Sequence, residues 1–413
     1  MARETLSGGT VSAGQGHATL FVLIVVFLDM VGFGLIIPVL PSLIEQVGHV
    51  DLAQASRVGG AMFAVFSLAQ FAFAPLMGNL SDRFGRRPLL LLAIGGLGVD
   101  YLFHAFAPTL FWLFIGRAIA GVCGASYVIA NAYLADVSAP QERARAFGLM
   151  GAAFGLGFIL GPALGGLLGE LGPRVPFFVA AAISGLNLIY GLFVLPESLP
   201  PSRRRPLNWR ACNPFGTLKV FARYPGVLPM AGVMGVYLFA SAIYPAIWPF
   251  WGMAKFGWTE GIIGLTLAAY GIVAAVFQGG MSGPLARRFG EAKVVFAGLL
   301  LGVVLLIALA LSSSLTMVLI VLCVTGIEGL VQPMLTSLMS RAVPEDEQGA
   351  LQGGISAVMN LAMLFGTLFF TQVFGIFQAE GAIIRTPDMA FYMASAILLT
   401  ALIWFAQLRR RGL

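Results

Sequence analysis

Four ionisable side chains lie inside long apolar segments of the chain, where a charge is costly. They are Asp29, Asp100, Arg117 and Glu328. A charged side chain at the centre of a membrane span costs roughly 2.5–3.5 kcal/mol, so each of the four needs a partner, water or a proton. The balance between burial and nearby charge decides whether a carboxyl group keeps its proton. The four residues therefore predict proton coupling, and structural pairing with a neighbouring helix is the alternative for each.

Arg117 and Glu328 differ in the chemistry they allow. An arginine stays charged, so Arg117 can hold a carboxylate in its ionised form but cannot carry the proton. Its alternative role is a static strut to the first span or to a backbone carbonyl. Glu328, between two glycines, can be a second proton site or an acceptor for a cationic group. Pairing with Gln332 or Asn360 is the structural alternative for Glu328.

The elements that position these residues are membrane helices. The chain has 413 residues, of which 59% are hydrophobic and 10% charged, whereas soluble domains carry about 25% charged residues. A helix needs about 20 apolar residues to cross a bilayer. Twelve segments meet this requirement: 18–44, 58–77, 88–107, 110–133, 146–169, 176–195, 228–250, 261–281, 293–312, 315–339, 350–376 and 389–408.

The first apolar run is too long for the h-region of a cleavable signal peptide, which spans about 7–15 residues. The three cysteines lack the paired spacing of a disulfide framework or a metal site. We therefore expect no metal and no cofactor. The net charge of +6 does not indicate nucleic acid, because the basic residues follow the membrane topology.

A repeat divides the chain into two related halves. Residues 78–88 read GNLSDRFGRRP and residues 283–293 read GPLARRFGEAK, so the second motif follows the first after 205 positions. The repeat predicts an all-α membrane protein made of two pseudo-symmetric six-helix bundles, 1–195 and 228–413, joined by a cytoplasmic linker loop, 196–227. Repeats of this kind are typical of transporters with a binding site between the halves.

The basic residues predict the orientation in the membrane. Most arginines and lysines lie on alternate loops, including the runs 203–205 and 409–411. By the positive-inside rule, these loops and both termini are cytoplasmic.

The twelve spans, the repeat and GNLSDRFGRRP resemble the major facilitator superfamily, whose signature loop lies between helices 2 and 3. GLGFILGPALGG (155–166) and IGRAIAGVCGAS (115–126) are similar to the helix 5 and helix 4 motifs of its proton-driven drug exporters. LDMVGFGLIIPVLP (28–41) and VDYLFHAF (99–106) resemble the tetracycline efflux proteins. Three positions depart from that group. Ala274 stands in place of its helix 8 histidine, Gly302 in place of its helix 9 acid, and Glu328 in place of a small residue.

The resemblance implies a conformational latch at the signature loop. Asp82 is expected to pair with an arginine and to meet the start of helix 11, near 348–349, in the outward-facing state, where helix N–H groups favour an anion. Gly78 and Gly85 are expected to form tight turns. Setting topology alone is the alternative role for the loop. The predicted latch residues are Gly78, Asp82, Arg83, Gly85, Arg86, Arg87 and Arg145.

Small residues in helix 5 predict close helix packing. The motif consists of Gly157, Gly161, Pro162 and Gly165, and the resemblance implies that it seals against helix 8 of the other half. Polar and aromatic side chains within the spans are candidates for substrate binding, with interhelical hydrogen bonding as the alternative. The candidates are Gln70, Asn131, Tyr237, Tyr244, Gln278, Gln332 and Asn360.

These features together predict a monomeric proton-coupled antiporter of the bacterial inner membrane. It would export small amphipathic compounds, tetracycline-like or multidrug, with the proton gradient as its energy source. Its partners would be the substrate, protons and membrane lipids, and it would not be an enzyme. The missing histidine and helix 9 acid keep one alternative open, a symporter or uniporter for a nutrient, metabolite or lipid-like molecule.

Overall fold

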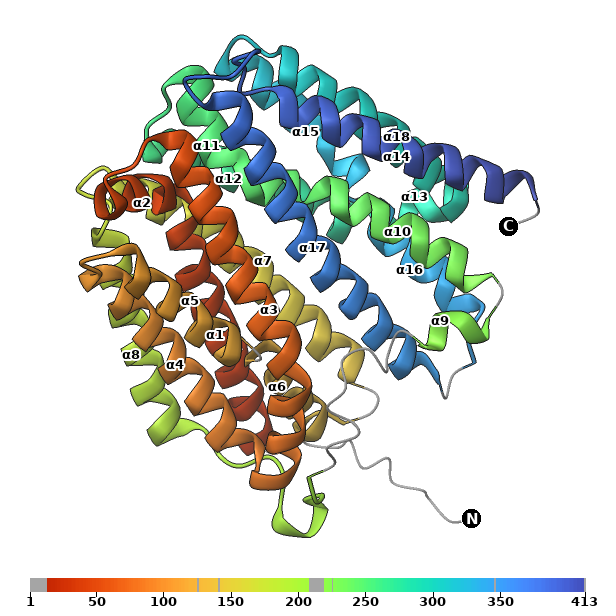
Figure 1. Ribbon diagram of the computed structural model, residues 1–413. Coiled ribbons are helices and arrows are strands. Elements are labelled where there is room, and N and C mark those ends of the chain that lie inside the picture. Colours follow the sequence, from red (N-terminus) through yellow and green to blue (C-terminus); the bar gives the residue numbers. More distant parts are fainter. Residues whose placement is uncertain are drawn as a thin grey trace.

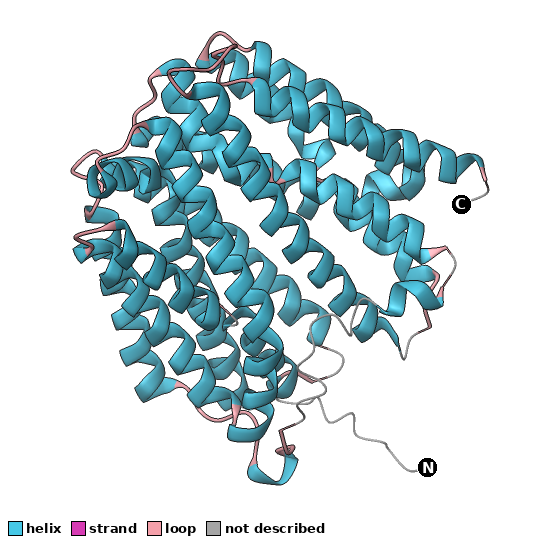
Figure 2. Cartoon of the chain, in the orientation of Figure 1, coloured by secondary structure: helices cyan, strands magenta, loops and turns pink. Residues whose placement is uncertain are grey.

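The computed structural model describes residues 13–124, 126–139, 142–207, 219–224, 226–344 and 347–411. Within these ranges the chain is helical, with short loops between the helices and no strands (Figure 2). It contains 12 segments that are long and apolar enough to cross a membrane. The prediction of twelve spans in an all-α membrane protein is therefore confirmed.

The helices of the first half run from α1 to α8, and several spans consist of two helical pieces. The first half contains α1 (Ala13–Ile36), η1 (Ile37–Val39), α2 (Leu40–Gly48), α3 (Leu52–Phe84), α4 (Arg86–Phe106), α5 (Leu110–Cys123), α6 (Ser126–Val137), α7 (Arg143–Gly169) and α8 (Val175–Val194).

The segment between the halves includes the short helices η2 (Pro201–Arg203) and α9 (Lys219–Arg223). The second half contains α10 (Val227–Ser241), α11 (Ile243–Phe256), α12 (Glu260–Ala275), the π-helical turn η5 (Val276–Met281), α13 (Ser282–Phe289), α14 (Glu291–Leu311), α15 (Leu315–Glu328), α16 (Val331–Arg341), α17 (Gln348–Gln378) and α18 (Met389–Arg410).

Local sequence signals explain why α3 is longer than the predicted span 58–77. The side chain of Asp51 caps the helix by accepting a hydrogen bond from the backbone N–H of Gln54 at 2.7 Å, as N-cap aspartates do. Gly85, with a φ of 109°, ends the helix, because that conformation is open mainly to glycine. Gly78 lies inside α3, so the prediction that it forms a tight turn is wrong.

The two bundles meet at one end and separate toward the other (Figure 1). Contacts between the halves are concentrated where α7 packs on α12 and where α3 packs on α17. Ser42 donates a hydrogen bond to Glu260 at 2.5 Å, and Ser56 donates to the carbonyl of Thr371 at 3.3 Å. We call this region, formed by α2, the start of α3, the ends of α7 and α17 and the start of α12, the closed end.

At the opposite ends of the same helices, the described residues leave open space around glycines of both halves. A side chain added at Gly148, Gly151 or Gly155 of α7, or at Gly349 of α17, would meet nothing within 4 Å. This end carries the signature loop and the C-terminus of α18 (Figure 1). We call it the basic end, and the structure is open there.

Glycine at position 264 allows the closed end to form. A Cβ atom at Gly264 would lie 3.0 Å from the Cα atom of Gly166 and against the carbonyl of Pro162. Since overpacking costs typically 1–3 kcal/mol, we expect Gly264→Val to shift the protein toward states in which this end is open. A cysteine placed at Ser42, in a background without the native cysteines, should then react about tenfold faster with a hydrophilic maleimide.

Gly185→Val is the matched control, because a side chain at Gly185 meets nothing within 4 Å. Equal labelling rates in the Gly264→Val and Gly185→Val proteins would show that the glycine does not govern closure.

Candidate functional site

Asp29 of α1 lies inside the first bundle with only neutral polar neighbours. Its side chain is 7% exposed, and Ser126 of α6 and Asn187 of α8 face the carboxyl group. In the described ranges, Asp29 forms no ion pair, and the buried amide atoms of Asn187 have no hydrogen-bond partner of their own. A buried carboxyl without a cation is cheapest in its neutral form, so this environment suits a group that binds a proton.

Arg117 of α5 pairs with Asp100 of α4, and this buried ion pair is the second polar group of the first bundle. Asp100 is fully buried and Arg117 is 9% exposed. The prediction that Arg117 holds a carboxylate is consistent with this pair. The alternative role for Arg117, a strut to the first span, is not what the structure shows. Its partner Asp100 lies in α4, which is the third span.

His104 completes this cluster and was not predicted as a site residue. Its Nδ1 atom lies 3.0 Å from the Asp100 carboxylate and 2.9 Å from the Asp100 carbonyl, and its ring stacks on Phe177 at 5.2 Å. The i, i+4 spacing of Asp100 and His104 on one helix was the sequence signal for it. Because the arginine neutralises Asp100, this cluster is a charge pair that holds α4 to α5.

Glu328 lies inside the second bundle, at the end of α15, and is 3% exposed. Tyr244 donates a hydrogen bond to its Oε2 atom at 2.9 Å, and Ser241 donates to its Oε1 atom at 3.3 Å. Tyr237 donates to the backbone carbonyl of Glu328 at 3.2 Å. The expected alternative, pairing with Gln332 or Asn360, is wrong, since its side-chain partners are these hydroxyl groups.

Tyr237 and Tyr244 are thus two predicted substrate-binding residues that the structure brings together with Glu328. The ring of Tyr270 from α12 stacks on Tyr244, with 6.1 Å between the centroids. Gln278 lies on η5 beside this group, 3.4 Å from where a Cβ atom of Gly329 would be. We call Tyr237, Tyr244, Tyr270 and Glu328 the tyrosine cluster.

The other predicted substrate-binding residues lie elsewhere. Gln70 of α3 donates to the carbonyl of Gly124, at the interruption between α5 and α6, at 3.1 Å. Gln332 contacts the sulfur of Met359 at 3.7 Å. Asn131 and Asn360 are half-buried. A role of these four residues in substrate binding stays a prediction.

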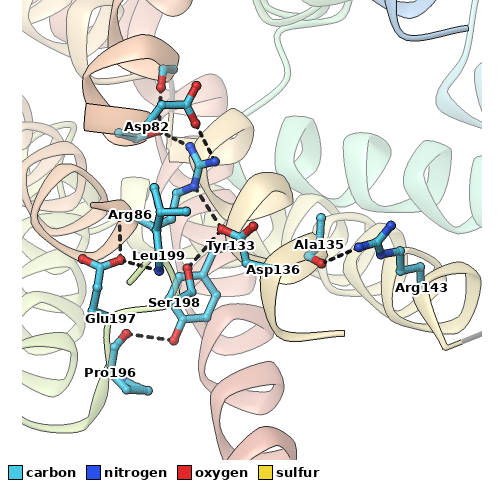
Figure 3. Close-up of polar contacts among 12 residues, drawn as sticks. Asp82, Arg86, Tyr133, Ala135, Asp136, Arg143, Pro196, Glu197, Ser198 and Leu199 are labelled. Carbon is cyan, nitrogen blue, oxygen red and sulfur yellow. Dashed lines mark hydrogen bonds and ion pairs between the residues drawn. The ribbon is translucent and has the colours of Figure 1, made fainter. Parts of the chain in front are cut away.

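Arg86 is the centre of a polar network at the basic end (Figure 3). Its guanidinium group binds Asp82 at 2.6 Å and Asp136 of α6 at 3.2 Å. Its backbone N–H donates to Glu197 at 2.8 Å, and the backbone N–H of Arg205 donates to the carbonyl of Asp82 at 3.1 Å. The sequence predicted Asp82 and Arg86 but not Asp136 or Glu197, which tie the signature loop to α6 and to the chain after α8.

Asp82 has no described contact with the start of α17 in this conformation. The side chain of Gln348 instead bonds to Ser340 and to the carbonyl of Val343. Arg83 lies over the Phe84 ring and Arg87 donates to the carbonyl of Leu192. Arg145 is exposed, and its described contacts do not include Asp82. The latch was predicted for the outward-facing state and stays a prediction.

The second half repeats the ion pair between Arg86 and Asp136 with its charges reversed. Glu291, at the start of α14, binds Arg341, at the end of α16, at 2.5 Å. These residues lie 205 positions after Arg86 and Asp136, the same offset as between the two basic motifs. The pair is therefore a feature of the repeat, and it joins the equivalent two helices in each bundle.

The glycine motif of α7 packs within its own half. Added Cβ atoms at Gly157, Gly161 and Gly165 would lie 2.6–2.8 Å from atoms of Met30, Gly34 and Leu35, all in α1. The expectation that this motif seals against helix 8 of the other half is wrong for Gly157, Gly161 and Gly165, and it is right for Pro162, whose carbonyl meets Gly264 of α12. A neighbouring face of α7, with Pro162 and Gly166, makes that contact with Gly264.

The chain forms two six-helix bundles, and several of its spans are interrupted. Buried carboxyl groups lie in both halves. Together these features define a membrane carrier. The sequence matches the Major Facilitator Superfamily over residues 22–243 and 230–412. The chain belongs to this superfamily and is a multi-pass membrane protein.

Among its relatives are tetracycline resistance proteins. The class C protein of Escherichia coli is 40% identical over 87% of this chain and 90% of its own length. The class G protein of Vibrio anguillarum is 35% identical over 86% of this chain and 90% of its own.

Solved structures share the fold. The human organic anion transporter MFSD10 matches with a TM-score of 0.69 and 25% identity over 95% of this chain and 99% of its own. A bacterial homologue of the lysosomal transporter Spinster, in an inward-facing and occupied conformation, matches with a TM-score of 0.77 and 16% identity over 97% of this chain and 98% of its own.

Proposed function

We propose that the protein exports amphipathic drug-like compounds, tetracyclines among them, in exchange for protons. The observation that carries this proposal is the 40% identity to the class C tetracycline resistance protein over most of both chains. It makes a drug the first substrate class to test, ahead of a nutrient or a metabolite.

The proton side of the exchange rests on Asp29. Its partners Ser126 and Asn187 are neutral, so the carboxyl group is stable when it carries a proton. Water reaching it as the bundles rock would allow the proton to leave. Asp100 does not take this role, because Arg117 neutralises it.

The basic end supports the orientation that we propose. The arginines of the signature loop and of the end of α18 lie there, and the positive-inside rule places such residues in the cytoplasm. The open side of this conformation therefore faces the cytoplasm of a bacterial inner membrane. A compound would enter from the cytoplasm, and rocking of the bundles would expose it to the other side.

Transport in reconstituted vesicles tests the proposal. Purified protein is placed in liposomes with an acidic interior, so that protons leaving the vesicle drive the compound inward. We expect tetracycline to accumulate well above the level in protein-free vesicles, and accumulation to stop when nigericin dissipates the gradient. Uptake that is indifferent to the gradient would indicate a uniporter, and uptake driven only by the opposite gradient would indicate a symporter. Either result overturns the proposal.

A further inference from the structure

We infer that the tyrosine cluster recognises a positively charged group of the substrate, with Glu328 as its counter-ion. This inference rests on the proposed function, because it names the substrate class, namely amphipathic compounds with one delocalised positive charge. It assigns substrate recognition to the second half and leaves the proton to Asp29 in the first.

The first argument is the lack of a cation beside a buried carboxylate. Glu328 is 3% exposed and forms no ion pair in the parts of the chain that the structure describes. Its side-chain partners are the hydroxyl groups of Tyr244 and Ser241. Buried charges in proteins are normally paired, and within a membrane they mark ion or substrate pathways. A buried carboxyl group with hydroxyl donors and no resident cation can stay neutral while the site is empty and ionise when a cation arrives to pair with it.

The second argument is the aromatic surroundings. Tyr237, Tyr244 and Tyr270 come from α10, α11 and α12, and the rings of Tyr244 and Tyr270 stack at 6.1 Å. A cation within about 6 Å of an aromatic ring is attracted to its face, by about 2 kcal/mol or more where water is excluded. The Tyr244 hydroxyl is 2.9 Å from the Glu328 carboxylate, so the carboxylate lies at the hydroxyl end of this ring, where a bulky cation paired with it can reach the ring faces of the cluster.

The third argument is the backbone. Three spans are interrupted around this cluster, where α10 gives way to α11, where α15 ends at Glu328, and where α12 passes into the π-helical turn η5. Phe277 of η5 packs on Gly326, and Gln278 lies beside Gly329. Interrupted helices form the substrate sites of many transporters, and π-helical turns are frequent at functional sites.

The cluster has a buried floor and an accessible rim. Glu328 and Tyr237 are buried, Tyr244 and Tyr270 are half-buried, and Gln278 is exposed. This gradient suits an amphipathic ion whose charge reaches the floor while its apolar part stays at the rim.

Direct binding tests the inference without a proton gradient. The full-length protein in detergent is titrated with tetraphenylphosphonium, a delocalised cation, and with triphenylphosphine oxide, a neutral compound of similar shape. We expect Glu328→Gln to weaken tetraphenylphosphonium binding at least tenfold, equivalent to about 1.4 kcal/mol, and to leave triphenylphosphine oxide binding unchanged. Glu380→Gln removes an exposed carboxylate outside the cluster and should change neither.

A relocated carboxylate provides a rescue test. Gly302 of α14 faces Glu328, and a Cβ atom there would lie 3.0 Å from its Cγ atom and 3.4 Å from its carboxyl carbon. It would also lie 2.7 Å from the Cδ2 atom of Leu398, the flexible end of a side chain that must shift. An aspartate at 302 therefore places its carboxyl group in the space left by a truncated residue 328. We expect the double variant Gly302→Asp, Glu328→Ala to bind tetraphenylphosphonium more tightly than Glu328→Ala alone.

The inference fails if Glu328→Gln leaves tetraphenylphosphonium affinity unchanged. It also fails if the variant loses the charged and the neutral compound equally, since that would indicate general damage to the cluster. The proposed function fails independently. Suppose that the cation binds as expected but that tetracycline uptake into vesicles does not depend on the pH gradient. The proposed antiport is then wrong, and the inference that the tyrosine cluster recognises a cation is still supported.

Discussion

Replacing Asp29 by asparagine should abolish accumulation of substrate against its gradient. Asparagine keeps the shape of the side chain and its contacts with Ser126 and Asn187, but it cannot bind and release a proton. Exchange of labelled for unlabelled substrate moves no net proton, so we expect this counterflow to persist in Asp29→Asn. The two activities are measured in the same vesicles, with and without a pH gradient.

The matched control is Asp51→Asn. It also removes one carboxylate, but Asp51 caps α3, and asparagine is an equally good N-cap residue. We expect Asp51→Asn to accumulate substrate like the unaltered protein. If Asp29→Asn accumulates substrate equally well, Asp29 does not carry the proton.

The sequence contains the information for the membrane helices because the bilayer imposes a simple rule. About 20 apolar residues are needed for each crossing, and the chain satisfies the rule 12 times. The limits of the helices depend on local contacts that apolar runs do not show. The cap formed by Asp51 and the positive φ of Gly85 extend α3 to 33 residues, and Pro75 lies inside this helix without ending it.

The candidate site was predictable one residue at a time but not as pairs. Asp29, Asp100, Arg117 and Glu328 stand out because charges are rare in apolar segments. Which of them meet depends on how helices rotate and pack, and hydropathy carries no information on rotation. Arg117 therefore pairs with Asp100, and Glu328 bonds to hydroxyl groups from α10 and α11.

The glycine motif shows the same limit. Spacing identifies a face of α7 that permits close approach, but it does not identify the partner. The structure places α1 against this face and the other half of the protein against the neighbouring face. A helix with small residues on two faces can hold its own bundle together and still close against the other bundle.

The buried carboxyl groups of the membrane spans fall into two kinds, according to their partners. Asp29 and Glu328 have neutral partners, one in each half, and both are free to change their charge or to accept a cation. Asp100 is held by Arg117, which makes its contribution one of stability. The difference predicts that the same type of substitution has different effects at the two positions. Asp29→Asn should lose transport, and Asp100→Asn should lose stability.

Breaking the pair of Asp100 and Arg117 should destabilise the protein strongly. Removing one partner of a buried ion pair costs about 3–5 kcal/mol, because the other charge stays buried without compensation. We expect Arg117→Gln and Asp100→Asn each to lower the apparent melting temperature in detergent by about 10 °C. The double variant Asp100→Asn, Arg117→Gln leaves no unpaired charge, so it should regain much of the lost stability.

The ion pair of Arg223 with Glu347 is the control for this experiment. The Arg223 side chain is 62% exposed and the Glu347 side chain 28%, and exposed ion pairs contribute about 0–1 kcal/mol, so Arg223→Gln should change the melting temperature little. Residues that act as a pair show non-additive effects. Stability losses in the double variant equal to the sum of the two single losses would therefore show that Asp100 and Arg117 stabilise the bundle separately, and that the charge on Asp100 is compensated by another group such as His104.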